Sequence, residues 1–167
     1  MAMDPNRWTL KTTEAFSAAT ELGRDASHPE IVPEHLFLAL LGQEEGIVLP
    51  LLHRVGVDIV AARNDAEQVL AKLPNAYGSE PQLSRAIRNV FDKADEVCET
   101  LSDEYLSTEH LLLALNGQTP VLGSLDHETL LGAVRDIRGS HRVTSQNPEK
   151  QYPVSYTHLT LPTICSV

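Results

Sequence analysis

The sequence is short of basic residues, of cysteine and of long apolar runs, and each shortage argues against a class of protein. Its 167 residues include 13 Lys and Arg against 23 Asp and Glu, which gives a formal net charge of -10. Surfaces that bind nucleic acid or anionic membranes are basic, so neither partner is expected. The two cysteines, Cys98 and Cys165, form no CxxC pair. Neither a disulfide framework nor a zinc site is therefore predicted, which fits a reducing compartment.

The chain also lacks the segments that direct a protein to or through a membrane. No apolar run approaches the roughly 18 residues of a membrane-spanning helix. The sequence that begins at Met1 has no apolar stretch typical of a signal peptide. We therefore expect a soluble, cytoplasmic protein whose length suffices for one domain with its own core.

Motifs for catalysis and cofactor binding are missing as well. The chain has no Gly-x-x-x-x-Gly-Lys-Ser/Thr loop to hold phosphates, so no ATP site or other cofactor site is expected. Its seven histidines include no His-Glu-x-x-His pattern and no pair spaced i, i+4, so no metal site is predicted. There is no Gly-x-Ser-x-Gly elbow, and no catalytic residue is expected. A triad drawn from distant parts of the chain leaves no such motif, so a small hydrolase remains the alternative from another class.

What the sequence does contain is an internal repeat. The segment EHLFLAL at 34–40 returns 75 positions later as EHLLLAL at 109–115. Without a gap, 8–43 laid over 83–118 gives 12 identities in 36 positions. Two copies of this length in a small chain predict a pseudo-two-fold globule.

Both copies show helical periodicity, so we expect an all-α fold. Apolar or small residues recur every three to four positions over 8–26 and again over 83–101. Thr9 and Ser84 stand where an N-cap belongs. The EHL segments, which we call the signature helices, are apolar almost all round. This predicts that they are central, with Leu38 and Leu113 as equivalent core positions.

Each copy continues with two further helices. A third helix over 47–55 is followed by Asp58 as the cap of a fourth, and in the second copy the third helix is shortened near Pro120. Asp126 then caps a last helix, which Gly139 ends. No alternating strand is seen. The chain therefore reads as two pseudo-symmetric four-helix repeats at 6–73 and 83–138, joined by a linker at 74–82.

The C-terminal part departs from this pattern. Residues 139–153 read as an exit linker, whereas 154–167 contain no charged residue and show neither helical period nor cap. The string YTHLTLPT resembles translated adapter or vector sequence. We interpret 154–167 as non-native and expect it to pack on nothing, the alternative being a native tail.

Two copies that each carry a Glu-His-Leu-x-x-Ala-Leu helix resemble the Clp N-terminal repeat domain, the module at the front of Clp-type AAA+ unfoldases. The resemblance covers about 6–138. The string RGSHRVTS at 138–145 is similar to the exit toward the middle of the ClpB disaggregases, in particular their actinobacterial form. Because ATPase modules follow in that family, the resemblance implies a chain truncated before them.

The resemblance also implies binding residues. Thr9, Asp103 and Glu109 match positions tied to chaperone activity in ClpB N-domains. The alternative for Thr9 is that it only caps a helix, and the alternative for Glu109 is that it only satisfies free amides at the start of the opposite helix. We therefore expect Asp103, in the loop between helices, to be the residue that faces a partner.

The same resemblance implies an apolar groove for extended segments of unfolded protein. The matching positions read Lys93, Val97 and His110, of which only Val97 is apolar. Either the groove is shifted toward neighbours, or Val97 belongs to the core. The apolar neighbours are Val90, Leu101 and Tyr105.

The function implied is capture of unfolded or aggregated polypeptide in the stress response, for transfer to an ATP-driven ring. A co-chaperone system or adaptor is a further possible partner. The isolated domain is expected to be a monomer, and its parent a homohexamer that uses ATP and Mg²⁺. The alternative within the family is the adaptor-docking N-domain of a Clp protease unfoldase of the ClpA or ClpC type. The RGSHRVTS exit favours the disaggregase.

Overall fold

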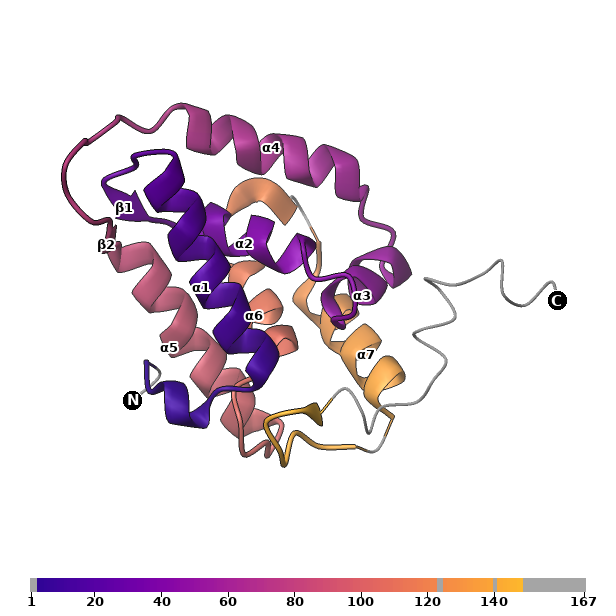
Figure 1. Ribbon diagram of the computed structural model, residues 1–167. Coiled ribbons are helices and arrows are strands. Elements are labelled where there is room, and N and C mark those ends of the chain that lie inside the picture. The colour runs from indigo at the N-terminus through magenta and orange to yellow at the C-terminus, as the bar shows by residue number, and fades with distance from the viewer. Residues whose placement is uncertain (1–2, 123–124, 140, 149–167) are drawn as a thin grey trace, which may run out of the picture.

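The computed structural model describes residues 3–122, 125–139 and 141–148 and shows an all-α architecture (Figure 1). The first repeat contains a short 3-10 helix, η1 (Pro5–Arg7), and the helices α1 (Leu10–Asp25), α2 (Pro33–Leu41), α3 (Val48–Arg54) and α4 (Ile59–Ala71). The second contains α5 (Arg85–Thr100), α6 (Thr108–Leu115), the 3-10 helix η2 (Pro120–Leu122) and α7 (His127–Arg138). The all-α class is confirmed, and η2 stands where a shortened third helix was predicted.

Side chains cap four of these helices at the positions expected from the sequence. The Thr9 hydroxyl accepts a hydrogen bond from the Thr12 amide at 3.2 Å, and the Ser84 hydroxyl accepts one from the Ile87 amide at 3.1 Å. Each bond satisfies an amide that has no partner inside its helix. The carboxylates of Asp58 and Asp126 cap α4 and α7 in the same way.

Short parallel strands, which the sequence did not predict, join the two repeats. β1 (Glu30–Ile31) pairs with β2 (Gln82–Leu83), and Ile31 lies opposite Leu83. An isolated bridge pairs Trp8 with Leu106 in the same parallel sense. Trp8 and Leu83 are equivalent residues of the two copies, and so are Ile31 and Leu106. The same contact is therefore made twice, between the start of each repeat and the loop before the signature helix of the other.

An aromatic cluster also connects the repeats. Trp8 is 2% exposed, and its ring centroid lies 5.3 Å from that of Phe16 and 5.1 Å from that of Phe91. The two phenylalanine rings, which are equivalent in α1 and α5, meet edge to face at 5.7 Å. Such ring pairs add to the stabilisation from buried area. Trp8 therefore contacts both repeats at once.

The signature helices α2 and α6 are central, as predicted. Eight of the nine residues of α2 and all eight of α6 are buried. Leu113 of α6 is 2% exposed, whereas its equivalent Leu38 in α2 is only partly buried. The expectation that both are core residues is wrong for Leu38, because the side of α2 that carries it borders a cleft.

The first part of the predicted exit linker lies against the domain. The Glu104 amide donates to the carbonyl of Val143, and the Leu10 amide donates to the carbonyl of Gln146, both at 2.8 Å. Val143 is completely buried. The segment 154–167, with the prediction that it packs on nothing, lies outside the described residues.

Two findings concern the described ranges as a whole. None of their helices combines the length and the apolar character needed to cross a bilayer. Within the same ranges, no three His, Cys, Asp or Glu side chains are grouped so that they could hold a metal ion.

Candidate functional site

The histidines of the two signature helices make the same local contact. His35 and His110 occupy the third position of α2 and α6, and both are completely buried. The Nδ1 atom of His35 accepts a hydrogen bond from the Val32 amide at 3.0 Å, and that of His110 accepts one from the Ser107 amide at 2.8 Å. Each imidazole thus satisfies a backbone amide at the start of its own helix, as Glu or Gln does in a capping box.

This contact determines where the ring proton lies. Because Nδ1 is an acceptor in both rings, we assign the proton to Nε2. In the first repeat Nε2 of His35 donates to Nδ1 of His28 at 2.9 Å. In the second repeat Nε2 of His110 donates to Oδ2 of Asp103 at 2.7 Å. His28 and Asp103 are equivalent positions of the two copies, so the same ring meets an imidazole in one repeat and a carboxylate in the other.

Asp103 is the centre of a buried charged cluster. Its two carboxylate oxygens accept hydrogen bonds from the Arg138 guanidinium at 2.6 Å and 3.0 Å. The Val143 amide donates to the same carboxylate at 2.9 Å. Glu109 lies 3.5 Å from Arg138 and accepts a short hydrogen bond from the Ser107 hydroxyl. The side chains of Asp103 and Glu109 are completely buried, and that of Arg138 is 5% exposed.

The pKa of Asp103 reflects this cluster. Burial by itself would raise the pKa, because it penalises the charged carboxylate. Hydrogen bonds from His110, Arg138 and the Val143 amide outweigh that effect and lower the pKa from 3.8 to about 2. The carboxylate is therefore ionised at neutral pH and joins the end of α7, the signature helix α6 and the exit segment.

The equivalent region of the first repeat carries less charge. Burial, and to a smaller extent the neighbouring His28, lower the pKa of His35 from 6.5 to about 4. Its ring is therefore neutral at physiological pH. Glu34, the equivalent of Glu109, accepts a short hydrogen bond from the Thr119 hydroxyl of the second repeat. This contact places a carboxylate of one repeat against a loop of the other.

The structure corrects the expectation for Asp103. We expected its side chain to face a partner from a loop, but that side chain is buried and its oxygens are occupied by Arg138, His110 and Val143. The physical reason is that the loop folds inward to neutralise Arg138 at the end of α7. Of the three residues implied by the resemblance, the structure brings Asp103 and Glu109 together around Arg138, and it places Thr9 at the start of α1 with a structural role.

The groove implied by the resemblance is not assembled by the three matching residues. Lys93 is exposed, whereas Val97 is 8% exposed and His110 is completely buried. Val97 belongs to the hydrophobic core, as the alternative interpretation held. Leu101 and Tyr105, two of the suggested neighbours, are partly exposed.

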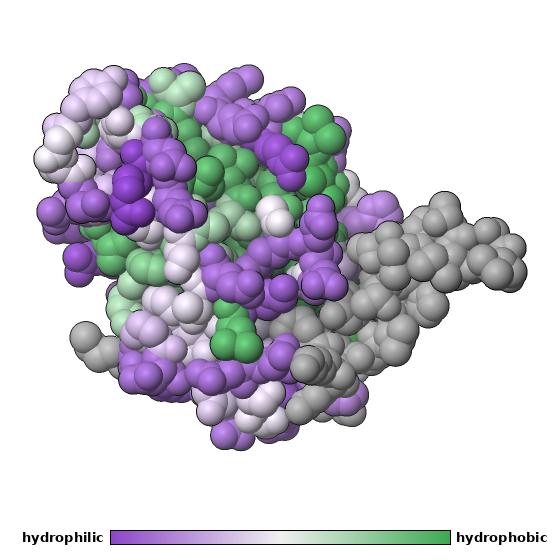
Figure 2. All heavy atoms as spheres, in the orientation of Figure 1, coloured by the Kyte–Doolittle hydropathy of each residue, from purple (hydrophilic) through white to green (hydrophobic). Residues whose placement is uncertain are grey.

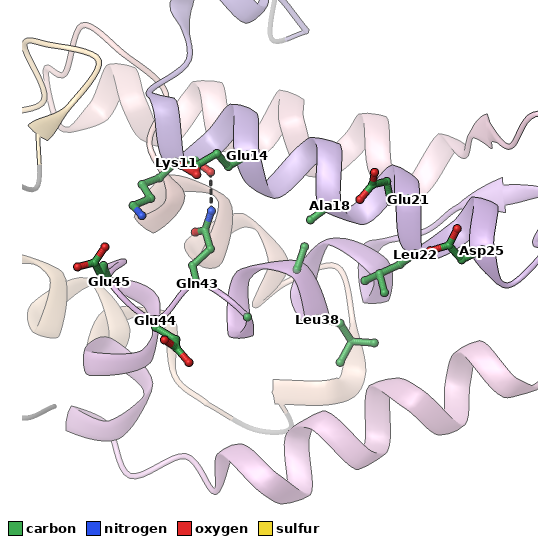
Figure 3. Close-up of a pocket in the computed structure, with 12 residues that line it drawn as sticks. Lys11, Glu14, Ala18, Glu21, Leu22, Asp25, Leu38, Gln43, Glu44 and Glu45 are labelled. Atoms are coloured by element: carbon green, nitrogen blue, oxygen red, sulfur yellow. Dashed lines mark hydrogen bonds between the residues drawn. The ribbon is translucent and has the colours of Figure 1, made fainter.

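An open cleft lies instead in the first repeat, between α1, α2 and the loop that follows α2 (Figure 3). Its volume is about 780 Å³, within the range typical of ligand sites. Small and apolar residues of the two helices line its floor, namely Ala18, Leu22, Leu38 and Ala39. Acidic residues dominate its rim, namely Glu14, Glu21, Asp25, Glu44 and Glu45, with Lys11 as the one basic lining residue.

The space-filling view shows where this cleft lies on the molecule. On the face drawn in Figure 2, apolar side chains gather over α2, between α1 and α4, with hydrophilic residues around them. Leu22 is 39% exposed, which is high for a large apolar side chain on a helix that packs against the core. The first repeat therefore offers a polar-rimmed apolar surface that our reading of the sequence did not identify.

Two features of the site were missed at the sequence level for different reasons. Arg138 was read only as part of the exit motif, and nothing near it in the chain indicates that Asp103 is its partner. The cleft had a signal, because the predicted groove positions Lys93 and Val97 correspond to Ala18 and Leu22 in the first copy. Applying the internal repeat to the groove would have pointed to α1.

The fold defines the class of this protein as a helical domain of two interlocked repeats, and comparison with known proteins identifies its family. A model of the family described as "Clp repeat (R) N-terminal domain" matches residues 7–124 of this chain. The chain belongs to this family. It is 42% identical over 158 residues to the chaperone protein ClpB of Mycobacterium leprae, covering 90% of this chain and 19% of that protein. It is 39% identical over 153 residues to ClpB of Corynebacterium diphtheriae, covering 86% and 18%.

Solved structures agree with this assignment. The N-terminal domain of the ClpV1 ATPase from an Escherichia coli type VI secretion system has a TM-score of 0.70 and 27% identity, covering 86% of this chain and 91% of that one. The Hsp104 N-terminal domain from Candida albicans has a TM-score of 0.74 at 21% identity, covering 85% and 98%, which shows the shared fold. The chain thus spans about a fifth of the length of its curated ClpB relatives and nearly all of these isolated N-domains.

Proposed function

We propose that this chain is the polypeptide-binding N-terminal domain of an ATP-dependent disaggregase of the ClpB kind. The observation that carries the proposal is the 39–42% identity to ClpB chaperones over at least 86% of the chain. In this proposal the domain captures unfolded or aggregated polypeptide without nucleotide. A hexameric ATPase ring that uses ATP and Mg²⁺ then acts on the captured segment in the cytoplasm.

The surface supports weak and promiscuous capture. A cleft with an apolar floor and a polar rim can accept many apolar side chains, because burial of apolar area does not depend on a particular sequence. A single cleft of this size buries little area, so we expect dissociation constants on the order of tens to hundreds of micromolar. Such binding releases segments readily, as transfer to a ring requires.

A titration tests the proposal. The ¹⁵N-labelled chain is titrated with a protein that has been reduced and carboxymethylated so that it cannot refold, and with the same protein in its native state as the control. We expect saturable chemical-shift changes with the unfolded form and none with the native form. Absence of any change at millimolar concentrations of the unfolded form would refute the function.

A second candidate is docking of a dedicated adaptor. One similar solved structure is a complex of a ClpV N-domain with a VipB peptide, at a TM-score of 0.58 and 18% identity. That likeness shows the fold alone, yet it demonstrates that a domain of this fold can hold a defined peptide. The two candidates differ in sequence dependence. A client site tolerates scrambling of the bound peptide at constant composition, whereas an adaptor site does not.

A further inference from the structure

We propose that the cleft of the first repeat selects polypeptide segments whose apolar side chains are flanked by Lys or Arg. This inference rests on the proposed function, because it names the site and the class of segment that the domain captures. Its evidence is the floor of the cleft, the charge of its rim, and the difference between the two repeats at equivalent positions.

The floor gives the apolar part of the recognition. Leu22 of α1 and Leu38 of α2 are both incompletely buried, and Figure 3 shows them pointing into the space between α1 and α4. Small residues beside them, Ala18 and Ala39, leave room for an incoming side chain. Apolar side chains that remain partly wet in a concave, polar-rimmed surface are typical of binding sites.

The rim gives the basic part of the recognition. Five carboxylates line the cleft, and none of them forms a hydrogen bond or ion pair through its side chain among the described residues. Some acidic residues elsewhere in the described ranges have basic partners, as in the pairs Arg24–Glu80 and Arg54–Asp136, and others, such as Asp92, have none. What distinguishes the cleft is that five carboxylates gather around one apolar floor. The negative potential of the cleft is therefore left for a ligand to neutralise, which favours cationic segments and disfavours acidic ones.

The duplication provides an internal control for this argument. At the positions equivalent to the five carboxylates, the second repeat has Asn89, Glu96, Thr100, Thr119 and Pro120. Its equivalents of Leu22 and Leu38 are Val97 and Leu113, which are 8% and 2% exposed, and Lys93 replaces Ala18. The same helix pair thus exists in this molecule with a closed floor and one carboxylate. The open acidic cleft is therefore not a requirement of the fold.

One polar group inside the cleft is also without a partner. Gln43 donates through Nε2 to the carbonyl of Lys11 at 2.8 Å, which fixes its side chain across one end of the cleft (Figure 3). Its Oε1 atom is buried and accepts no hydrogen bond among the described residues. Through its Nε2 atom, Gln43 therefore ties the loop after α2 to α1 at this end of the cleft.

The test compares three short synthetic peptides by chemical-shift titration of the full chain. The first has a leucine-rich centre flanked by lysines, the second has glutamates in place of the lysines, and the third keeps the lysines but has serines in the centre. We expect the first to bind about tenfold more tightly than either control, because several exposed charge pairs and the apolar floor must contribute together. Its affinity should fall as salt screens the rim. The shifts should centre on Leu22, Leu38 and Gln43.

Two variants locate the effect. Glu21→Lys combined with Asp25→Lys reverses charge at the cleft, and Asp92→Lys combined with Glu99→Lys makes the same charge change on exposed residues of α5. We expect the first pair to weaken binding of the lysine peptide about tenfold and the second to leave it within about twofold. If the first pair does not fold, Glu44→Lys with Glu45→Lys in the loop after α2 makes the same test.

The outcomes separate this inference from the proposed function. Equal binding of the lysine and glutamate peptides, or shifts that centre on Leu101 and Tyr105 instead of the cleft, would overturn the inference while leaving polypeptide capture intact. If neither the three peptides nor the unfolded protein perturbed the spectrum, both this inference and the proposed function would be refuted.

Discussion

At the scale of single residues, one position decides what each signature histidine does. His35 and His110 cap their helices in the same way, but His28 stands beside the first and Asp103 beside the second. With a carboxylate at that position, a buried arginine can be neutralised and the exit segment held through Val143. A substitution at Asp103 is therefore expected to act through the stability of the domain and the position of the exit segment, because the Asp103 side chain is completely buried.

Asp103→Ala should destabilise the domain by roughly 3–5 kcal/mol, because it removes the carboxylate that accepts hydrogen bonds from the buried Arg138, from His110 and from the Val143 amide. The measurement is urea unfolding at neutral pH. Asp92→Ala, on the exposed face of α5 and without a partner among the described residues, is the control and should change stability by less than about 0.5 kcal/mol. Equal effects of the two variants would contradict a stabilising role for the buried charged cluster around Asp103.

The stability of the domain should fall as pH is lowered from about 6.5 to about 4, because of His35. The folded state lowers the pKa of this histidine to about 4, so the unfolded state binds the proton first. Stability from the neutral ring is fully present above pH 6.5 and is lost on the order of 3 kcal/mol by pH 4.

His35→Gln provides the matched variant for this pH dependence. The glutamine oxygen can still accept from the Val32 amide, but it does not titrate. Urea unfolding of both proteins at several pH values should show a steeper loss in the wild type between pH 6.5 and 4. Parallel curves for the two proteins would mean that His35 titrates with its ordinary pKa.

At the scale of elements, the two signature helices are equivalent in sequence but not in exposure. α6 is closed on all sides, whereas the side of α2 that carries Leu38 borders the cleft. Leu113→Ala should therefore cost about 2–5 kcal/mol through lost transfer energy and a cavity. Leu38→Ala should cost about 1 kcal/mol or less, since less area is taken from contact. Thermal or urea unfolding of both variants measures the two losses of stability. Equal losses for Leu113→Ala and Leu38→Ala would show that the cleft is closed in solution.

At the scale of the whole molecule, the repeats are joined too closely to be independent units. Each repeat supplies a pairing partner for the other at β1–β2 and at Trp8–Leu106, and Trp8 packs on phenylalanines of both. The buried surface of α2 and α6 is likewise shared, since the two helices contact one another. A repeat on its own would expose these surfaces to water.

Unfolding of the full chain should consequently be a single cooperative transition. Trp8 fluorescence reports the junction between the repeats and circular dichroism reports the helices, so the two midpoints in urea should coincide. A fragment that ends within 74–82 should show little helical signal by itself, because short helices without tertiary packing are marginal in water. Separate transitions, or a well-folded fragment, would show that the repeats are independent domains.

The sequence was sufficient for those features that depend on near neighbours in the chain. The caps at Thr9 and Ser84 and the helical periods are local patterns, and each is confirmed. The duplication was visible because the same local pattern occurs twice in the chain. The pseudo-two-fold arrangement follows from the duplication, because equivalent segments bury equivalent faces. The helices and their order were therefore predictable before any tertiary contact was known.

Only the tertiary structure decided which equivalent positions are buried and which are open. Asp103 and Arg138 are 35 positions apart, and their pairing depends on how α7 returns to the loop before α6. The strands β1 and β2, which pair between the repeats, are only two residues long each, and this is too short to produce an alternating pattern in the sequence. The exposure of Leu22 and Leu38 depends on how closely α1 and α2 approach, which is set by packing over the whole repeat. These features arise from long-range contacts, and long-range contacts have no local pattern in the sequence.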